Sequence, residues 1–249
     1  MTPLIILSHN AFWFQGVPFA TDVPREPDAA VLNRLCAIYR QVHADVICLQ
    51  EIQSQDAFEM VATQLGMPGC YCPGTILPQY GGAVFWRPGQ GSRVQDARTA
   101  SLATQRMWQI VDIHNGNGRL RVGNIHLPSS RQLGPDAAQA QRIAELRDAI
   151  TICEERPDVI AGDLNEQPAG PVNAFLRSHA YRDAAVLAKR ADAPTTLGAN
   201  RGDYIWISKK IESRVSQYTV LSRQALACTT CDKEYVSDHF PLWITVGAP

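Results

Sequence analysis

Residues 45–51 read DVICLQE, four apolar residues in succession that lead into Gln50 and Glu51. A short apolar run rich in β-forming residues predicts a buried strand. A core strand does not normally end in a carboxylate, because a buried charge must be paired or bound to a cation. The stretch therefore predicts a strand that delivers an acidic side chain to one edge of a sheet.

The same arrangement recurs along the chain. Polar clusters also follow predicted strands at SHN (8–10), NIH (124–126) and GDLN (162–165). Polar groups at strand ends can converge on one rim of a sheet stack, so these clusters predict a shared site. The predicted strands are residues 4–8, 46–50, 83–86, 109–113, 120–125, 159–161, 204–208, 213–220 and 240–246.

Three segments have the apolar spacing of amphipathic helices, at residues 31–42, 54–65 and 140–150. Ser54 is the predicted N-cap of the second. Strands and helices alternate in mixed order, without a long linker or a repeat. This order predicts one α+β domain over residues 1–249, built on packed sheets.

Composition excludes several classes of protein. The 249 residues are 45% hydrophobic and 19% charged, which is typical of a soluble globule. With 23 Lys and Arg against 24 Asp and Glu, the net charge is −1, so no global positive field would hold a polyanion. No run approaches the roughly 18 apolar residues of a membrane span. We expect a cytoplasmic monomer without a membrane span.

The seven cysteines include two close pairs, Cys70 with Cys72 and Cys228 with Cys231. Two pairs could make a tetrahedral zinc site, but each lacks the regular zinc-knuckle context on both sides. Free or redox-active thiols are therefore favoured over structural zinc.

Six segments together resemble the endonuclease/exonuclease/phosphatase superfamily, whose members share the fold of deoxyribonuclease I. Each is a weak signal alone, but their order and intervals are specific, and they run over nearly the whole chain. The resemblance implies a four-layer α/β/β/α sandwich of two packed mixed sheets flanked by helices. The segments are SHN (8–10), DVICLQE (45–51), GNIHLPS (123–129), AGDLNEQP (161–168), GDYIWIS (202–208) and SDHFPLWITV (237–246).

The resemblance implies a divalent metal site. Glu51 would be the principal Mg²⁺ ligand, with the amide oxygen of Asn10 beside the metal and Asp238 as a second carboxylate. Mg²⁺ prefers one or two carboxylates and keeps several waters, and Mn²⁺ suits the same oxygen ligands. Without the other motifs, Glu51 would be read as a surface residue at a strand end and Asn10 as a turn residue.

Asp163 and Asn165 flank Leu164 at spacing i and i+2. If strand geometry persists, both point to the same side while Leu164 enters the core. The resemblance implies that Asp163 orients or deprotonates the attacking water and that Asn165 donates to a phosphoryl oxygen. The alternative is an Asx-turn leading into Pro168.

The resemblance pairs the imidazole of His239 with the carboxylate of Asp203. Such a carboxylate fixes the ring tautomer and raises the basicity of the other nitrogen, so His239 could accept a proton or, when charged, stabilise the transition state. Whether His239 or Asp163 is the general base stays open. His126 would hydrogen-bond the scissile phosphate or assist the leaving group, and Ser129 would add a donor. The other histidines are read as structural: His9, His43, His114 and His179.

These roles imply hydrolysis of a phosphoester by in-line attack of water, without a covalent enzyme intermediate. The superfamily includes nucleases, sphingomyelinases, inositol phosphatases and deadenylases, so the substrate stays open. A nuclease is the leading interpretation. A phosphatase or phosphodiesterase acting on a small-molecule, nucleotide or lipid phosphate is the second. The third is a catalytically silent binding module, which the complete residue set disfavours.

Three features bear on the substrate. His126 stands where abasic-site endonucleases of the family carry Tyr, and Phe12 stands at an acidic position, which weakens a repair assignment. The aromatic loop at residues 11–27 could stack on a base or hold an apolar group, or pack against the core. Seven arginines crowd the middle of the chain and predict either a local phosphate-binding patch or a solvated face: Arg87, Arg93, Arg98, Arg106, Arg119, Arg121 and Arg131.

Overall fold

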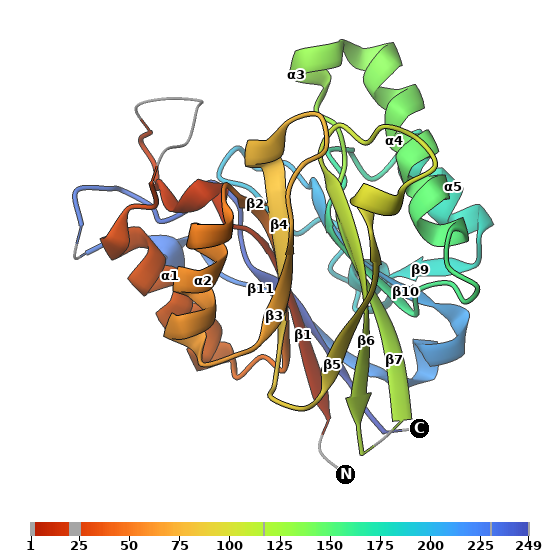
Figure 1. The fold of residues 1–249 in the computed structure, drawn as a ribbon, viewed down its shortest axis with the longest axis horizontal. Coiled ribbons are helices and arrows are strands. Elements are labelled where there is room, and N and C mark those ends of the chain that lie inside the picture. Colours follow the sequence, from red (N-terminus) through yellow and green to blue (C-terminus); the bar gives the residue numbers. More distant parts are fainter. Residues whose placement is uncertain (1–2, 20–25, 117, 230, 249) are drawn as a thin grey trace.

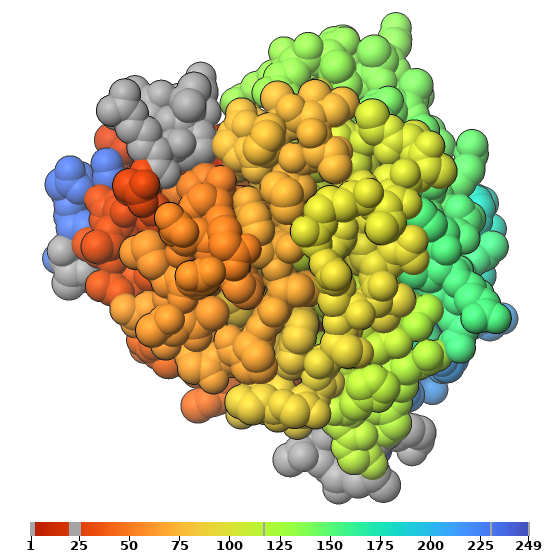
Figure 2. Space-filling model, in the orientation of Figure 1, coloured from red at the N-terminus to blue at the C-terminus, as the bar shows by residue number. Residues whose placement is uncertain are grey.

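Two six-stranded sheets pack face to face in the computed structural model, which describes residues 3–19, 26–116, 118–229 and 231–248 (Figure 1). Helices cover the outer face of each sheet, so the predicted four-layer α/β/β/α sandwich is confirmed. The space-filling view in Figure 2 shows side chains covering the gap that the ribbons leave between the sheets on this face. No helix in the described part of the chain is long and apolar enough to cross a membrane.

The first sheet has the strand order β11-β12-β1-β2-β4-β3. Its central pair, β1 and β2, is parallel, and the other neighbours are antiparallel. Every residue of β2 is buried, as the apolar run at its start predicts. The strands are β1 (Leu4–Asn10), β2 (Val46–Ile52), β3 (Gly69–Cys72), β4 (Gly81–Trp86), β11 (Val215–Val220) and β12 (Leu242–Val246).

The second sheet has the order β5-β6-β7-β8-β10-β9, with β7 and β8 parallel. Side chains from the inner faces of both sheets, such as Val46 and Val122, form the central core. The strands are β5 (Gly91–Asp96), β6 (Met107–Asn115), β7 (Gly118–His126), β8 (Val159–Asp163), β9 (Tyr181–Asp183) and β10 (Asp203–Ser208).

The helices on the first sheet have well-defined ends. Helix α1 (Ala29–Val42) begins at Asp28, whose carboxylate accepts from two backbone N–H groups. Helix α2 (Gln55–Leu65) begins at Ser54, whose hydroxyl accepts from Ala57 N at 3.1 Å, so the predicted cap is confirmed. The remaining helices are α3 (Ser130–Leu133), α4 (Pro135–Thr151), α5 (Pro171–Ser178), α6 (Ala184–Leu187) and the short 3₁₀ segments at Phe12–Phe14, Pro78–Tyr80, Ala97–Thr99, Lys209–Arg214 and Arg223–Leu226.

Asn124 joins the two sheets through polar contacts inside the apolar core. From β7 in the second sheet, its amide nitrogen donates to the carbonyl oxygens of Leu49 at 2.9 Å and Ala83 at 3.1 Å, both in the first sheet. Its amide oxygen accepts from Gln50 Nε2 at 2.7 Å. The residue has no exposed surface. These contacts fix the position of β7 relative to β2, because each hydrogen bond forms only when the two strands are aligned in one way across the sheets.

We predict that Asn124→Leu lowers the free energy of unfolding by about 3 kcal/mol, because it removes three buried hydrogen bonds between the sheets. Urea denaturation followed by tryptophan fluorescence measures the loss. Asn33→Leu on the exposed face of α1 is the control and should change stability by less than about 0.5 kcal/mol. Equal effects of the two substitutions would show that the cross-sheet contacts contribute no stability.

Candidate active site

Polar side chains from both sheets line a cleft of about 390 Å³. They come from the C-terminal ends of β2 and β8 and from the loop that precedes β12. The polar side chains that follow these strands therefore lie together in one cleft, as the sequence predicts. The predicted site residues that line it are Glu51, Ser129, Asp163, Asn165, Asp238 and His239.

Glu51 lies at an irregularity of β2. The pairing of β2 with β4 shifts register between Gln50 and Ile52, and Glu51 has φ of 56°. A bulge of this kind re-aims a side chain, and the left-handed backbone of a non-glycine residue costs free energy that the surrounding structure must offset. Burial raises the pKa of Glu51 to about 7, against the lowering effect of the nearby Arg106 cation. Its Oε2 atom has no hydrogen-bond partner in the described structure.

Asp163 and Asn165 meet through a turn and not through a continued strand. Strand β8 ends at Asp163, and Asn165 has φ of 50°. The Asn165 N–H donates to Asp163 Oδ1 at 2.8 Å, which is the Asx-turn alternative. The expectation that strand geometry persists is therefore wrong, because the strand ends at Asp163 and the backbone is left-handed at Asn165. Leu164 is buried as expected, and both polar side chains still line the cleft.

His239 and Asp203 form the expected contact. His239 Nδ1 lies 2.9 Å from Asp203 Oδ2, and that oxygen also accepts from the hydroxyl of Thr195 at 2.7 Å. Burial opposes the charged form of His239, but the carboxylates of Asp203 and Asp238 raise its pKa well above the ordinary value. Asp203 Oδ, Asp163 Oδ and the His239 ring nitrogen lie within 4.8 Å of one another.

His126 lies beneath the cleft. It has no exposed surface, and its Nε2 lies 3.4 Å from Asp163 Oδ2 and in contact with the Arg106 guanidinium. Burial, reinforced by the Arg106 charge, lowers the pKa of His126 to about 3, so the ring is neutral at pH 7. This placement differs from the expected direct contact with a phosphate, because Arg106 is the group that reaches the cleft.

The two remaining predicted residues have local partners. The amide nitrogen of Asn10 donates to Asp163 Oδ2 at 3.2 Å, while its amide oxygen accepts from Phe12 N at 3.0 Å. The hydroxyl of Ser129 accepts from Arg131 N at 3.3 Å and caps α3 at the cleft. Asn10 therefore holds the Asp163 carboxylate through a buried hydrogen bond.

Asp163 carries a negative charge at neutral pH. Burial raises its pKa, but the hydrogen bond from His126 and the charges of His239 and Arg106 outweigh burial and hold the pKa well below the usual range. An ionised carboxylate beside a cationic imidazole can accept a proton, and the imidazole can stabilise negative charge.

An aromatic wall closes one side of the cleft. Phe12, Trp13 and Phe14 each have φ near 50°, which is strained for three successive side-chain-bearing residues. Phe14 is buried in the core, while Phe12 and Trp13 line the cleft with Phe19 and Tyr80. The loop thus both packs against the core and shapes the site. Residues 20–25 of the predicted loop lie outside the described residues.

The seven arginines in the middle of the chain do not form one patch. Arg93 and Arg98 pair with Asp96, and Arg121 pairs with Asp112 at 2.8 Å. Arg119 pairs with Glu155 and with the same Asp112, and Arg87 pairs with Asp45. Only Arg106 and Arg131 of the seven line the described cleft. The expectation of a shared phosphate-binding patch therefore reduces to these two cations.

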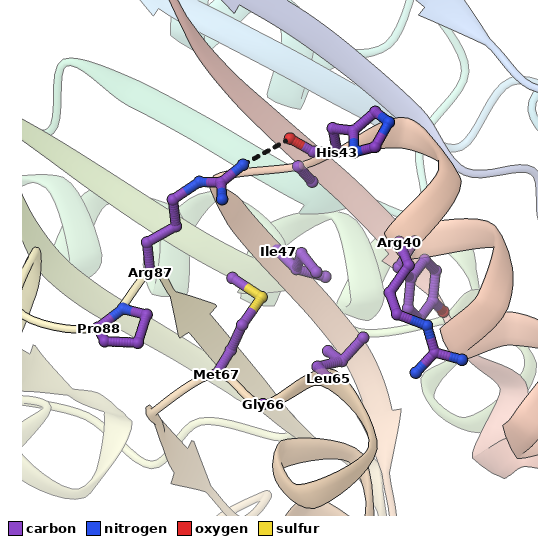
Figure 3. Close-up of a pocket in the computed structure, with 10 residues that line it drawn as sticks. Arg40, His43, Ile47, Leu65, Gly66, Met67, Arg87 and Pro88 are labelled. Atoms are coloured by element: carbon purple, nitrogen blue, oxygen red, sulfur yellow. Dashed lines mark hydrogen bonds between the residues drawn. The ribbon is translucent and has the colours of Figure 1, made fainter.

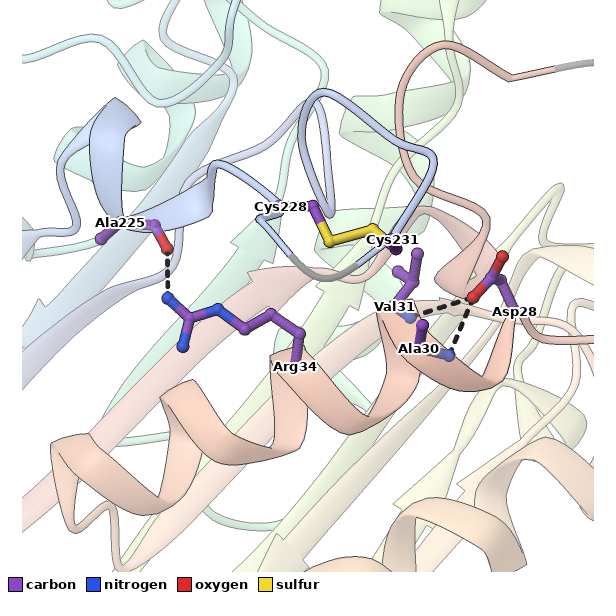
Figure 4. Close-up of a disulfide and its surroundings, with 7 residues drawn as sticks. All are labelled: Asp28, Ala30, Val31, Arg34, Ala225, Cys228 and Cys231. Atoms are coloured by element: carbon purple, nitrogen blue, oxygen red, sulfur yellow. Dashed lines mark hydrogen bonds between the residues drawn. A yellow bond between two sulfur atoms is a disulfide. The ribbon is translucent and has the colours of Figure 1, made fainter.

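The cysteine pairs differ from each other. Cys228 and Cys231 form a disulfide over the beginning of α1, near Val31 (Figure 4). Of the two expected alternatives, free thiols are wrong for this pair, because the two residues lie three apart in one loop and are bonded to each other; redox activity of the pair stays a prediction. Cys70 and Cys72 are free, and burial raises the pKa of both thiols to about 12, which leaves them protonated and unreactive at pH 7.

A second cavity of about 410 Å³ lies at the other end of β2 (Figure 3). Ile47, Leu65 and Met67 give it an apolar floor, and Arg87 donates to the His43 carbonyl at 3.3 Å on its margin. Ile47 stands near the start of β2, whereas Glu51 stands near its end, so this cavity is separate from the cleft.

Three residues at or behind the cleft lie outside the six motifs: Arg106, Tyr80 and Thr195. Of these, only Arg106 was named from the sequence, as one of the seven arginines of a possible phosphate-binding patch. The Arg106 guanidinium lies 4.3 Å from the centre of the Tyr80 ring and 3.8 Å from Glu51 Oε1. Thr195 holds Asp203 from a segment without any motif.

Comparison with known proteins agrees with this geometry. The family model described as "Endonuclease/Exonuclease/phosphatase family" matches residues 7–239. The human Nocturnin catalytic domain with bound sulfate is 21% identical, covers 98% of this chain and 93% of its own, and has a TM-score of 0.69. A search of curated proteins finds no significant match.

Two further solved structures share the fold. D. rerio TDP2 complexed with a single-strand DNA product is 17% identical, with 98% of this chain and 99% of its own covered and a TM-score of 0.69. A family protein from Leptotrichia buccalis C-1013-b is 16% identical, with coverages of 98% and 99% and a TM-score of 0.72.

Burial of Glu51 predicts a loss of stability as pH rises in the absence of metal. Its pKa is higher in the folded state than in the unfolded chain, so folding favours the protonated form and stability falls between about pH 4.5 and pH 7. With chelator present, wild type should lose about 2 to 3 kcal/mol relative to Glu51→Gln between pH 5 and pH 8, measured by urea denaturation. Glu59→Gln on exposed α2 should follow wild type; if Glu51→Gln does so too, Glu51 is not the responsible group.

Proposed function

The chain belongs to the Endonuclease/Exonuclease/phosphatase family, and from that premise we propose that it is a divalent-metal-dependent phosphoesterase that hydrolyses a phosphodiester by in-line attack of water. One observation carries the proposal: Glu51 Oε2 and Asp238 Oδ1, two buried carboxylate oxygens without hydrogen-bond partners among the described residues, belong to side chains that line the same cleft as His239, whose ring contacts Asp203. Acidic oxygens that lack a hydrogen-bond donor, next to a charged imidazole, fit a cation and a phosphate together.

The metal would be held by Glu51 and Asp238, with the amide oxygen of Asn10 beside it. This set offers only hard oxygen donors and leaves room for water and substrate, as Mg²⁺ requires, and Mn²⁺ accepts the same donors. When bound, the ion would polarise the phosphoryl group and offset its negative charge.

Three side chains of the cleft would carry out the other steps of hydrolysis. Asp163, ionised and held by Asn10, would orient the water and accept its proton. His239, charged through its contact with Asp203, would stabilise negative charge on the phosphoryl oxygens. Asn165 lines the same cleft and supplies a neutral amide donor. This assignment makes Asp163 the base and His239 the electrostatic partner.

Phosphate binding would also use Arg106 and Ser129 at the margins of the cleft. Arg106 is 5% exposed and held by Tyr80 and Glu51, so its guanidinium is fixed in place. His126 would act from beneath, by orienting Arg106 and Asp163.

The leading substrate is an unpaired nucleic-acid strand. Aromatic side chains beside the cleft, among them the half-exposed Phe19, suit stacking on a base. The two cleft cations, Arg106 and Arg131, could hold adjacent phosphates. The fold neighbour D. rerio TDP2 was solved with a single-strand DNA product. The small volume of the cleft favours, as a second candidate, hydrolysis of a nucleotide, small-molecule or lipid phosphate.

Mg²⁺ should stabilise the folded protein through Glu51. At a concentration about 100 times its Kd, the ion adds about 2.7 kcal/mol, which corresponds to a rise in Tm of several degrees for a chain of this size. Differential scanning fluorimetry should show this rise for wild type and for the control Glu59→Gln, and its loss in Glu51→Gln. An undiminished rise in Glu51→Gln would mean that the ion binds elsewhere.

Hydrolysis should depend on Asp163 and His239. With Mg²⁺, the wild type should cleave bis-p-nitrophenyl phosphate and single-stranded DNA, and Asp163→Asn and His239→Ala should each lower kcat about a thousandfold. His114→Ala, with an exposed imidazole on β6, is the matched control and should retain activity.

The same assay includes plasmid DNA, nucleotides and phospholipids. Turnover of only small or lipid phosphates would replace the nuclease assignment with the second candidate. Full activity in Asp163→Asn and His239→Ala would refute the proposed site.

A further inference from the structure

The backbone of His239 is held to β1 on both sides of its peptide. Its N–H donates to the hydroxyl oxygen of Ser237 at 3.1 Å, and that hydroxyl donates to the Asn10 carbonyl at 3.0 Å. Its carbonyl oxygen lies 3.1 Å from Nε2 of His9. The His239 side chain is therefore attached to a backbone segment whose position is fixed by hydrogen bonds to strand β1.

The neighbouring residues are paired on the opposite side. Leu197 N donates to the Asp238 carbonyl at 2.8 Å, and Phe240 N donates to the Thr195 carbonyl at 2.7 Å. Residue 239 is thus the point at which this segment turns its hydrogen-bonding groups toward the first sheet. Among the described residues, the His239 carbonyl accepts its hydrogen bond from His9.

His9 has a second partner on α1. Its Nδ1 lies 2.6 Å from the hydroxyl of Tyr39, and both side chains are almost completely buried. A carbonyl oxygen can only accept, so Nε2 of His9 must carry the proton. In the neutral ring Nδ1 is then the acceptor, and the Tyr39 hydroxyl is its donor. The donor and the acceptor in both hydrogen bonds of His9 are therefore defined.

We infer that Tyr39 and His9 are positioning residues for His239: the Tyr39 hydroxyl fixes the tautomer and orientation of His9, and His9 Nε2–H fixes the carbonyl of His239. The inference rests on the proposed role of His239 in hydrolysis. Neither side chain is among the described residues that line the cleft. They act through the backbone, which keeps the His239 ring against Asp203 and its free nitrogen toward the substrate.

Tyr39→Phe tests this relay because it removes one hydroxyl and little volume. With bis-p-nitrophenyl phosphate and saturating Mg²⁺, kcat should fall about tenfold at unchanged KM, since small misplacements of a reacting group cost up to about a hundredfold in rate. Tyr181→Phe is the matched control. Tyr181 is equally buried, and its hydroxyl donates to the Pro157 carbonyl at 2.7 Å on the second sheet. It should lose similar stability and keep wild-type kcat.

A double-mutant cycle separates a relay from two independent effects. His9→Phe keeps a ring but removes both nitrogens, so it should lower kcat by itself, and Tyr39→Phe should then add no further loss. If the two losses multiply, or if Tyr39→Phe retains the kcat of Tyr181→Phe, the relay is wrong.

A readout without turnover keeps this test independent of the proposed function. Long-range ¹H–¹⁵N spectra of the Mg²⁺-loaded protein should show His9 as the Nε2–H tautomer. Tyr39→Phe should shift the ring nitrogens of both His9 and His239, and Tyr181→Phe should shift neither. If the wild type hydrolyses no substrate, the proposed function fails and these spectra alone decide the relay. An unmoved His239 signal in Tyr39→Phe would overturn it.

Discussion

The hydrogen bonds of Asn124 set the geometry on which the cleft depends. Two apolar sheet faces can slide over each other with little change in buried area, because the hydrophobic effect is not directional. Asn124 removes that freedom by requiring specific partners on β2 and β4. Gln50 directly precedes Glu51, and Asn124 lies two residues before His126. The contact therefore places Glu51 Oε1 at 3.9 Å from His126 Nε2, across the junction of the sheets.

The central strands were predictable from sequence, as was the edge strand β11, but the other three edge strands were not. Strands such as β2 and β8 are buried throughout, so their sequences are continuous apolar runs. The strands β3, β5 and β9 were missed, and each lies at a sheet edge. In β5 three consecutive residues are exposed, so it lacks the apolar pattern that identifies a strand. Their positions follow from partners distant in sequence.

The candidate site divides in the same way. Residues next to a buried strand, such as Glu51 and Asp163, were identifiable because the motif and the strand are contiguous. Arg106 could not be separated from the other six arginines and Thr195 was not identified, because each is placed by a contact that no motif contains. His126 was assigned correctly to the region, but its depth below the cleft depends on how Arg106 and Tyr80 pack above it. Motifs thus identify which residues gather, and packing decides which of them solvent can reach.

The left-handed segment Phe12–Phe14 has a consequence for the order of folding. Each of these residues prefers other backbone conformations by about 1 to 2 kcal/mol, so local preference opposes the aromatic wall. Compensation comes from the burial of Phe14 and from the hydrogen bond of Ala11 N to the Gln50 carbonyl at 2.9 Å. Both require β1 and β2 to be paired already. The wall can therefore form only with or after the pairing of β1 and β2, so any loosening of that pair would remove one side of the cleft.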